Sequence, residues 1–179
     1  ITDLTVNRNH LYLVGLTKSY SQIATAGAFK PTKIYYGTFF DIDGFVMKLD
    51  TGMNTKAWGT YLGGNFSSMP YNVIVDQDSN LVLSGSTYAT NIATQNAFLT
   101  VNPAINQLAG LAMKFTHSGS LLWSTYFGDS DSELTRTYKS TDSKTLLLTR
   151  WKSSSLNPTN CSTSWNSSHY MSLHTIDSN

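Results

Sequence analysis

The sequence predicts an all-β protein built from β-propeller blades, which are four-stranded antiparallel repeats of about 65 residues. Two observations support this prediction. The stretch WGTYLG at 58–63 returns as WSTYFG at 123–128, and self-similarity at a fixed spacing is the signature of a repeat architecture. The apolar segments are short, rich in β-branched, aromatic or leucine residues, and bounded by Gly, Asn, Asp or Ser, which is typical of strands.

The repeat covers most of the chain. The segments that match, first copy and then second, are 3–17 with 72–87, 21–29 with 90–98, 44–52 with 110–119, and 58–63 with 123–128. A weaker third copy follows at Tyr138–Arg150 and Tyr170–Asp177. We therefore expect one all-β, propeller-like domain or segment over residues 1–179. Its first repeat is expected at 1–64, its second at 65–128, and a degenerate third at 129–179.

Each unit is expected to contain four strands. In the second unit the predicted strands are 73–76, 81–85, 111–115 and 121–127. The connections DQDSN and THSGS are short enough to form hairpin turns only, since Asp, Asn, Ser and Gly supply the geometry of tight turns. Strand segments such as TLLLT and LYLVG are apolar on both faces, which favours sheets stacked face to face.

The repeat pattern is incomplete at both ends. No strand of the Trp58 type precedes residue 3, and the chain ends at Asn179 before a third one. We therefore expect eleven strands in three blades, the last of which lacks its fourth strand. Propellers close with about four to eight blades, so we expect an incomplete ring with unpaired edges. Both terminal blades are expected to contact protein, either the remainder of the same chain or neighbouring copies, and the isolated chain is expected to oligomerise or aggregate.

These motifs resemble the SBBP repeat, a bacterial β-propeller repeat found mostly in large secreted or surface proteins. Three landmarks carry the resemblance: YLGG at 61–64, GST at 85–87 and AF at 97–98. The family has no catalytic motif, so the resemblance implies a scaffold or surface module. The third unit departs from the pattern, because Arg150 stands where the other units have Gly15 and Gly85. We therefore expect the third unit to be the least regular.

The composition narrows the class of protein. Charged residues make up 13% of the chain and the formal net charge is +1, so the electrostatic footprint of a nucleic-acid-binding protein is missing. No apolar run approaches the length of about 20 residues that spans a bilayer, so we expect no membrane insertion. Abundant Ser, Thr and Asn with many aromatic residues are typical of a secreted or cell-surface β-protein. The single cysteine, Cys161, can be a buried residue, a surface thiol or half of an intermolecular bridge.

The sequence indicates no catalytic residue, no cofactor and no metal site. DQDSN has the oxygen spacing of a calcium loop, but it lacks the following glycine and the distal glutamate, so we interpret it as a hairpin turn. Asp129, Asp131 and Glu133 form a denser acidic loop that is an alternative calcium site. The histidines His10, His117, His169 and His174 are scattered. Asp41 and Asp43 precede a strand, and we interpret Asp43 as a turn or cap residue.

The aromatic residues fall into two groups. Those at repeat positions are expected to pack the sheets, with Trp58 and Trp123 at equivalent positions and Gly63 and Gly128 at equivalent turns. The other packing residues of this group are Tyr61 and Tyr126. Trp151 and Trp165 lie outside the repeat pattern, so they are the candidates for contact with a ligand.

Three N-glycosylation sequons are present, at Asn65, Asn160 and Asn166. Chance alone predicts about this number in a chain so rich in Asn, Ser and Thr, so they are glycosylation sites only if the protein is secreted by a eukaryote.

The sequence therefore predicts a non-enzymatic extracellular module that works in adhesion, surface display or filament assembly. The alternative is a carbohydrate-binding, lectin-like propeller, in which Trp151 or Trp165 would contact the glycan. A propeller-based enzyme would need converging carboxylates or a set of metal ligands, and the sequence indicates neither. The expected location is secreted or at the cell surface.

Overall fold

The computed structural model describes residues 1–37, 41–52, 55–104, 107–128, 133–139, 145–151, 162–164 and 170–176. From residue 133 onward only the course of the backbone is described. Within these ranges the chain forms strands, turns and loops without a helix, so they hold no helix that is long and apolar enough to cross a membrane. The prediction of an all-β protein is confirmed.

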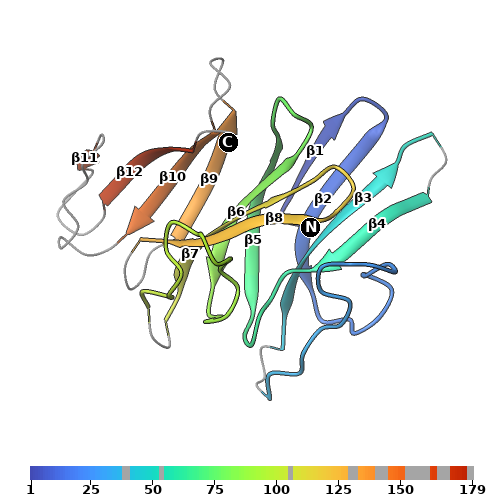
Figure 1. Ribbon diagram of the computed structural model, residues 1–179, viewed down its shortest axis with the longest axis horizontal. Coiled ribbons are helices and arrows are strands. Elements are labelled where there is room, and N and C mark those ends of the chain that lie inside the picture. The colour runs from blue at the N-terminus through green and yellow to red at the C-terminus, as the bar shows by residue number, and fades with distance from the viewer. Residues whose placement is uncertain are drawn as a thin grey trace.

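The described part of the chain contains twelve strands arranged in three four-stranded antiparallel sheets (Figure 1). The first sheet has the order β1 (Asp3–Asn7), β2 (His10–Thr17), β3 (Asp43–Asp50) and β4 (Thr55–Tyr61). The second has the order β5 (Ser68–Val75), β6 (Leu81–Thr87), β7 (Ala109–Phe115) and β8 (Leu121–Phe127). The third has the order β9 (Glu133–Lys139), β10 (Thr145–Trp151), β12 (Tyr170–Ile176) and β11 (Ser162–Ser164).

The strands of the second sheet lie where the sequence predicts them, except that β5 begins at Ser68 rather than at Val73. The sequence does not predict this start, because Pro70 lacks the backbone N–H that a central strand needs. It is tolerated here because β5 is an edge strand, and because the register shifts between Pro70 and Asn72 at a β-bulge.

The prediction of eleven strands is wrong at the third sheet. The short strand β11 pairs with β12 through Ser162 and Ser172, and so occupies the outer position that β4 and β8 hold in the other sheets. It precedes its neighbour in the chain, whereas β4 and β8 follow theirs, so the third sheet is built differently from the first two. The first sheet is also complete, because β4 pairs with β3.

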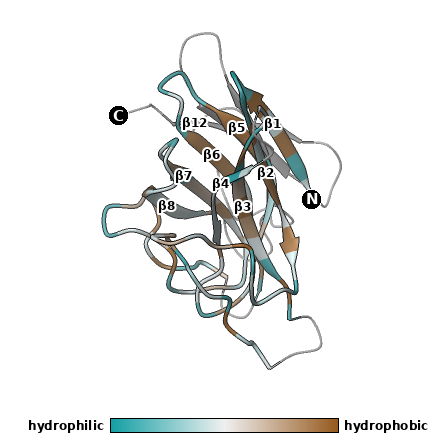
Figure 2. Ribbon diagram, turned by 90° about the vertical axis from the view of Figure 1, so that its right-hand side faces the viewer, coloured by the Kyte–Doolittle hydropathy of each residue, from teal (hydrophilic) through white to brown (hydrophobic). Residues whose placement is uncertain are grey.

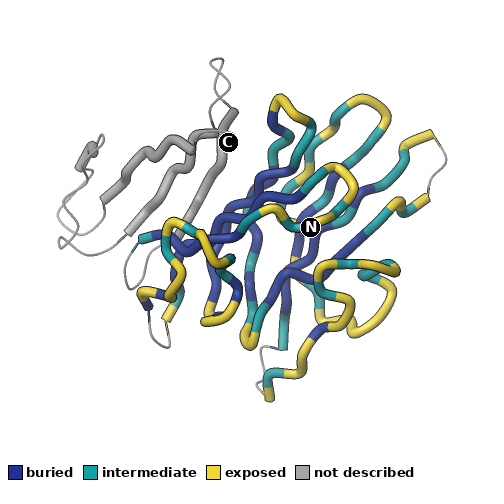
Figure 3. The backbone as a smooth tube through the Cα atoms, in the orientation of Figure 1, coloured by how far each residue is buried: buried dark blue, intermediate teal, exposed yellow. Residues whose placement is uncertain are grey.

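The sheets are stacked one after another through their first strands. β5 contacts β1, β2 and β3 of the first sheet, and β9 contacts β5, β6 and β7 of the second. The second sheet therefore lies between the other two, as Figure 1 shows. Its strands are buried along much of their length (Figure 3), and hydrophobic residues dominate β3, β5, β6 and β7 whereas the turns are hydrophilic (Figure 2).

The core lies between the first and second sheets. Tyr12, Val14 and Val46 of the first sheet belong to the same buried cluster as Val73 and Leu83 of the second. All five are at most 2% exposed. Burial of such side chains stabilises a protein by about 1.5–3 kcal/mol each, so this contact holds the two sheets together.

A carboxylate joins the two sheets at the bulge in β5. Asp3 on β1 accepts a hydrogen bond from the backbone N–H of Val73 at 2.9 Å and one from the side-chain amide of Asn72 at 2.5 Å. Thr2 donates its hydroxyl to the carbonyl of Pro70 at 2.7 Å. Polar contacts therefore anchor β1 on the strand of the second sheet that faces it.

Trp58 makes the corresponding contact at the outer strands. Its indole N–H donates to the carbonyl of His117 at 3.0 Å, and Lys48 Nζ donates to the same oxygen at 3.2 Å. The turn that carries His117 passes so close that a Cβ on Gly119 would lie 2.8 Å from the Trp58 ring. Gly119 also has a φ of 93°, so glycine is required there for two reasons.

We predict that Asp3→Ala weakens the contact between the sheets, because it leaves the Val73 N–H without its acceptor. The free energy of unfolding should fall by about 1–3 kcal/mol, measured by urea unfolding. Asp78→Ala, which removes an exposed carboxylate from the β5–β6 turn, is the control and should change it by less than about 0.5 kcal/mol. Equal losses in the two variants would contradict this role for Asp3.

Candidate functional site

The two long connections, 18–42 and 88–108, lie at the same end of the sheets (Figure 1). Each connection returns along the outer strand of its own sheet. The Thr25 N–H donates to the carbonyl of Gly59 on β4 at 3.0 Å, and the Thr94 N–H donates to that of Ser124 on β8 at 2.9 Å. The loops therefore cover strand edges that would otherwise expose unpaired backbone groups.

Threonine hydroxyls hold each loop a second time, near its middle. Thr60 accepts the backbone N–H of Lys30 at 2.8 Å, and Thr125 accepts that of Leu99 at 2.9 Å. These are the threonines of the repeated W-x-T-Y stretch, so the repeated residues build the same loop attachment in two sheets. The side chains that follow the attachment differ between them.

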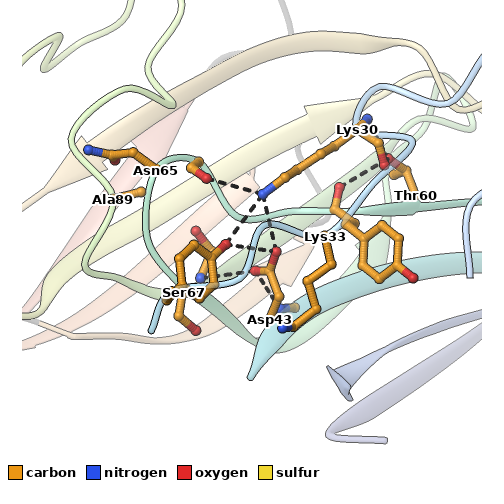
Figure 4. A network of polar contacts seen from close by, with 12 residues as sticks. Lys30, Lys33, Asp43, Thr60, Asn65, Ser67 and Ala89 are labelled. Atoms are coloured by element: carbon orange, nitrogen blue, oxygen red, sulfur yellow. Dashed lines mark hydrogen bonds and ion pairs between the residues drawn. The ribbon is translucent and has the colours of Figure 1, made fainter. Parts of the chain in front are cut away.

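In the first sheet the attached residue, Lys30, reaches a buried carboxylate. Asp43 is fully buried, and its Oδ2 accepts hydrogen bonds from Lys30 Nζ at 3.2 Å and from the Tyr36 hydroxyl at 3.1 Å. Its Oδ1 accepts the backbone N–H groups of Gly44 at 2.8 Å and of Ser68 at 3.3 Å. Figure 4 shows Lys30 extended between Thr60 at its backbone end and Asp43 at its ammonium end. Asp43 is therefore saturated with donors, one of them from the second sheet.

The turn after β4 makes room for this carboxylate. A Cβ on Gly63 would lie 2.2 Å from Asp43 Oδ1, and the carbonyl of Gly64 accepts a further hydrogen bond from Lys30 at 3.1 Å. Gly63 is thus required by the close approach of Asp43. Gly128 has a φ of 81°, a left-handed conformation that Gly63 does not share, but the residues after Gly128 lie outside the described ranges, so the equivalence of the two turns stays a prediction.

A second ion pair lies in the same loop. Lys33 Nζ is 2.5 Å from Asp41 Oδ1, and the Lys33 side chain is fully buried. Its ammonium lies 4.1 Å from the centre of the Tyr20 ring and 5.6 Å from that of Tyr36. The Tyr20 hydroxyl donates to Asp41. Two lysines and two aspartates thus balance in charge, and the tyrosine rings shield one of the cations.

Aromatic rings surround this charged core. Tyr36 stacks on Phe66 with 6.2 Å between ring centres. Tyr35, Tyr20 and Phe66 are 68%, 49% and 45% exposed, so they present ring surface to solvent. We call Tyr20, Tyr35, Tyr36 and Phe66, with the Lys30–Asp43 and Lys33–Asp41 pairs, the loop cluster.

Burial dominates the electrostatics of the loop cluster. It raises the pKa of Asp43, although Lys30 and the donors from Ser68 and Gly44 act in the opposite direction. It lowers the pKa of both Lys30 and Lys33 against the attraction of Asp43. The pKa of Tyr36 is raised by burial and then by the charge of Asp43. The pairs are thus expensive to bury and serve to position the loop rather than to stabilise it strongly.

The second sheet offers an internal comparison. Ala109 begins β7 opposite Thr87, as Asp43 begins β3 opposite Thr17, and both are fully buried. Leu99 occupies the loop position of Lys30 and packs against the core. An ion pair in the first sheet is therefore replaced by two apolar residues in the second.

Several residues singled out from the sequence are structural. Asp76 accepts the N–H of Asn80 across the β5–β6 turn at 2.8 Å and pairs with Lys114 Nζ at 3.0 Å, so this segment is a hairpin turn as predicted. Among the residues that the structure describes, no three or more His, Cys, Asp or Glu side chains come together to hold a metal ion.

The repeated aromatic residues pack the sheets, as predicted. Trp58 and Trp123 lie opposite Lys48 and Lys114, at equivalent positions in the first two sheets. Tyr61 and Tyr126 are fully buried. The Tyr61 hydroxyl donates to the carbonyl of Ser19 at 3.0 Å, and that of Tyr126 accepts the N–H of Ile92 at 3.2 Å.

The predicted ligand contacts lie largely beyond the described residues. Trp151 is the last residue of β10, but its side chain is not described. Glu133 is the first residue of β9, with its side chain likewise not described. The other residues singled out from this part of the chain, namely Asp129, Asp131, Asn160, Cys161, Trp165, Asn166 and His169, are outside the described ranges.

The sequon at Asn65 lies on an exposed turn. The Asn65 amide donates to the Thr90 hydroxyl at 3.0 Å and accepts the Thr90 N–H at 2.9 Å. A glycan on Asn65 Nδ2 would replace one of its two protons and leave the other as a donor to Thr90.

Asp43 begins β3 and accepts the backbone N–H groups of Gly44 and Ser68, which agrees with its interpretation as a turn or cap residue, but its other oxygen belongs to the loop cluster, which sequence reasoning did not predict. Sequence reasoning also missed Lys30, Lys33 and Tyr36. One signal was available: at two matched positions, Lys30 replaces Leu99 and Asp43 replaces Ala109. A paired replacement of apolar by oppositely charged residues indicates a contact.

No protein-family model matches this sequence, and a search of curated proteins also finds no match. Function is therefore inferred from the residues of the chain itself.

We predict that Asp43→Ala and Lys30→Leu each lower the free energy of unfolding by about 3–5 kcal/mol, since each leaves a buried charge unpaired. The triple variant Lys30→Leu/Tyr36→Phe/Asp43→Ala should recover part of this loss, because no buried charge of the pair is left unpaired. It should stay below the parent protein by about 1–3 kcal/mol, because the buried N–H groups of Gly44 and Ser68 still lack their acceptor. It reproduces the apolar pair of the second sheet and leaves no hydroxyl without an acceptor. Urea unfolding of all three variants makes the test, and additive losses would contradict the coupling.

The pH dependence of stability follows from the same pair. Because the pKa of Asp43 is raised, its stabilising contribution is complete below the ordinary aspartate pKa of about 3.9 and is lost as pH rises through the raised value. The lowered pKa of Lys30 makes stability recover only toward alkaline pH. We therefore expect the parent protein to lose stability relative to the triple variant between acid and neutral pH. A relative gain over that interval, measured by urea unfolding at a series of pH values, would contradict the assignment.

Proposed function

We propose that this chain is a non-enzymatic extracellular module whose three sheets are β-propeller blades of the SBBP type, working in adhesion, surface display or filament assembly. Support for the blade architecture comes from the stacking of β1, β5 and β9 and from the identical loop attachments in the first two sheets. Residues of the repeat have structural tasks: Thr25 and Thr94 attach the loops, and Tyr61 and Tyr126 fill the core.

One observation carries the non-enzymatic part of the proposal. Each buried charged side chain in the described part of the chain has a structural partner. Those of the loop cluster pair with one another, Lys114 pairs with Asp76, and Lys48 donates to the carbonyl of His117. A catalytic acid, base or nucleophile needs a reactive group that faces a substrate. These charges instead hold loops and sheets in place.

A carbohydrate-binding function is the second candidate, and the loop cluster favours it. Exposed tyrosine and phenylalanine rings beside fixed charged groups suit a sugar, whose apolar face stacks on an aromatic ring while its hydroxyls meet polar groups. Tyr35, at 68% exposed, offers the largest ring surface among the tyrosines of the cluster. We therefore propose Tyr35 as a candidate contact, in addition to the predicted Trp151 and Trp165.

Two measurements on the full chain test the proposal. Protease treatment of intact cells that make the protein should remove it if it is displayed at the surface, and protection from the protease would contradict an extracellular location. A glycan array then separates the two candidate functions. The structural module predicts no specific binding, whereas the lectin predicts binding to a defined set of glycans.

If glycans bind, we predict that Tyr35→Ala reduces the affinity by about tenfold or more, which corresponds to the loss of one stacking contact of about 1.4 kcal/mol. Phe98→Ala is the matched control. Phe98 is an exposed aromatic residue like Tyr35, at 73% exposed, but it lies outside the loop cluster and stacks on Phe127 of the second sheet. Loss of binding in Trp151→Ala or Trp165→Ala, with Tyr35→Ala unaffected, would move the site to the third unit.

A further inference from the structure

The two faces of the second sheet differ in what covers them. The face toward the first sheet is apolar and consists of Val73, Val75, Leu81, Leu83, Leu111, Met113 and Phe115. Val73 and Leu83 lie opposite each other on neighbouring strands and are each 2% exposed. The first sheet excludes water from them through Tyr12 and Val14.

The first sheet has the same apolar face on its far side. Leu4 lies opposite Leu13, as Val73 lies opposite Leu83, and the whole register matches in the same way. We call this set of seven residues the open face: Leu4, Val6, Leu11, Leu13, Phe45, Met47 and Leu49.

Exposure sets the two faces apart. Leu4 is 53% exposed and Val6 is 61% exposed, whereas Val73, the counterpart of Leu4, is buried. Phe45 is buried, and the other four residues of the open face are partly buried, so Leu4 and Val6 are its exposed part. Apolar residues presented together on one sheet face indicate a surface that a partner covers. None of the seven residues is charged, and Lys56, which lies opposite Leu49, donates to the carbonyls of Gln22 and Ile23, so an ionic ligand does not suit the exposed part of this face. The matching face of the second sheet is covered by the face of another four-stranded sheet, so we expect such a sheet to cover the open face too.

The order of the sheets identifies that partner. β1 contacts β5, and β5 contacts β9, so each sheet carries the next one on the same side. We propose that the open face binds the third sheet of a second copy of this chain, so that β9 of one copy lies against β1 of the next. This proposal rests on the proposed blade architecture and names the partner of its first sheet. It continues the stacking within the chain across the boundary between copies.

Such a contact is heterologous, because the first sheet of one copy meets the third sheet of another. Heterologous contacts generate rings when the rotation closes and open filaments when it does not. Under this proposal, a copy that has lost its open face can still bind the end of an assembly through its third sheet but cannot extend it.

Sedimentation velocity of the full chain over a concentration series tests the proposal. The parent protein should associate, and Leu4→Glu and Val6→Glu should each weaken association by about tenfold or more while leaving the β-sheet circular dichroism and the unfolding midpoint close to those of the parent. Leu122→Glu is the matched control: Leu122 is 47% exposed on β8, outside the open face, and its replacement should leave association unchanged. A parent protein that stays monomeric, or a control that dissociates as much as Leu4→Glu, would overturn the proposal.

A mixing experiment tests the partner. Leu4→Glu protein added to the parent should cap the growing end and shorten the assemblies in proportion to its share. Assemblies of unchanged size would mean that two open faces bind each other, which also overturns the proposal. Neither outcome depends on surface exposure or glycan binding, so a failure here is distinct from a failure of the proposed function.

Discussion

A four-stranded sheet that is apolar on both faces cannot remain in water, and this constraint organises the molecule. The second sheet meets it with the first sheet on one side and β9 of the third on the other. Its strands β6 and β7 are buried along their whole length, because each face of the sheet has a cover. Asp3 and Trp58 fix how one layer sits on the next, and the threonine attachments hold each loop on its own sheet.

The loop cluster has the charged pair Lys30–Asp43 where the second sheet has the apolar residues Leu99 and Ala109. Burying Asp43 beside Lys30 brings little net stability, because the cost of removing both charges from water offsets most of their attraction. The pair instead fixes the relative positions of the groups that it joins. Asp43 accepts only at fixed geometry, so the loop, the start of β3 and the Ser68 N–H of the second sheet are set relative to one another. The same arrangement holds Tyr20 and Tyr36 beside Lys33, leaving aromatic surface exposed at one end of the sheets.

Periodicity and turn chemistry are local properties, and they were sufficient to predict an all-β chain and most strands of the second sheet. The start of β5 could not be predicted, because Pro70 argues against a strand unless its edge position is known. The partnership of Lys30 with Asp43 escaped because it joins a loop to a strand, and a single sequence gives no spacing rule for such a pair. Strand β11 escaped for a similar reason: Ser162–Ser164 has no apolar pattern, and only its neighbour β12 makes it a strand. The repeat could have supplied part of this information, since the matched Leu99 and Ala109 show where the first unit departs from the second.

The threonine attachments allow the loops to vary without a change in the sheets. Lys30 and Leu99 are held in the same way on Thr60 and Thr125, yet the stretch that follows each of them differs in length and composition, 31–42 in one unit and 100–108 in the other. The fold has thus already accepted two unrelated inserts at one architectural position. For protein engineering, this makes the interval a natural grafting point, where foreign recognition segments can be displayed side by side on successive units without redesign of the scaffold beneath them.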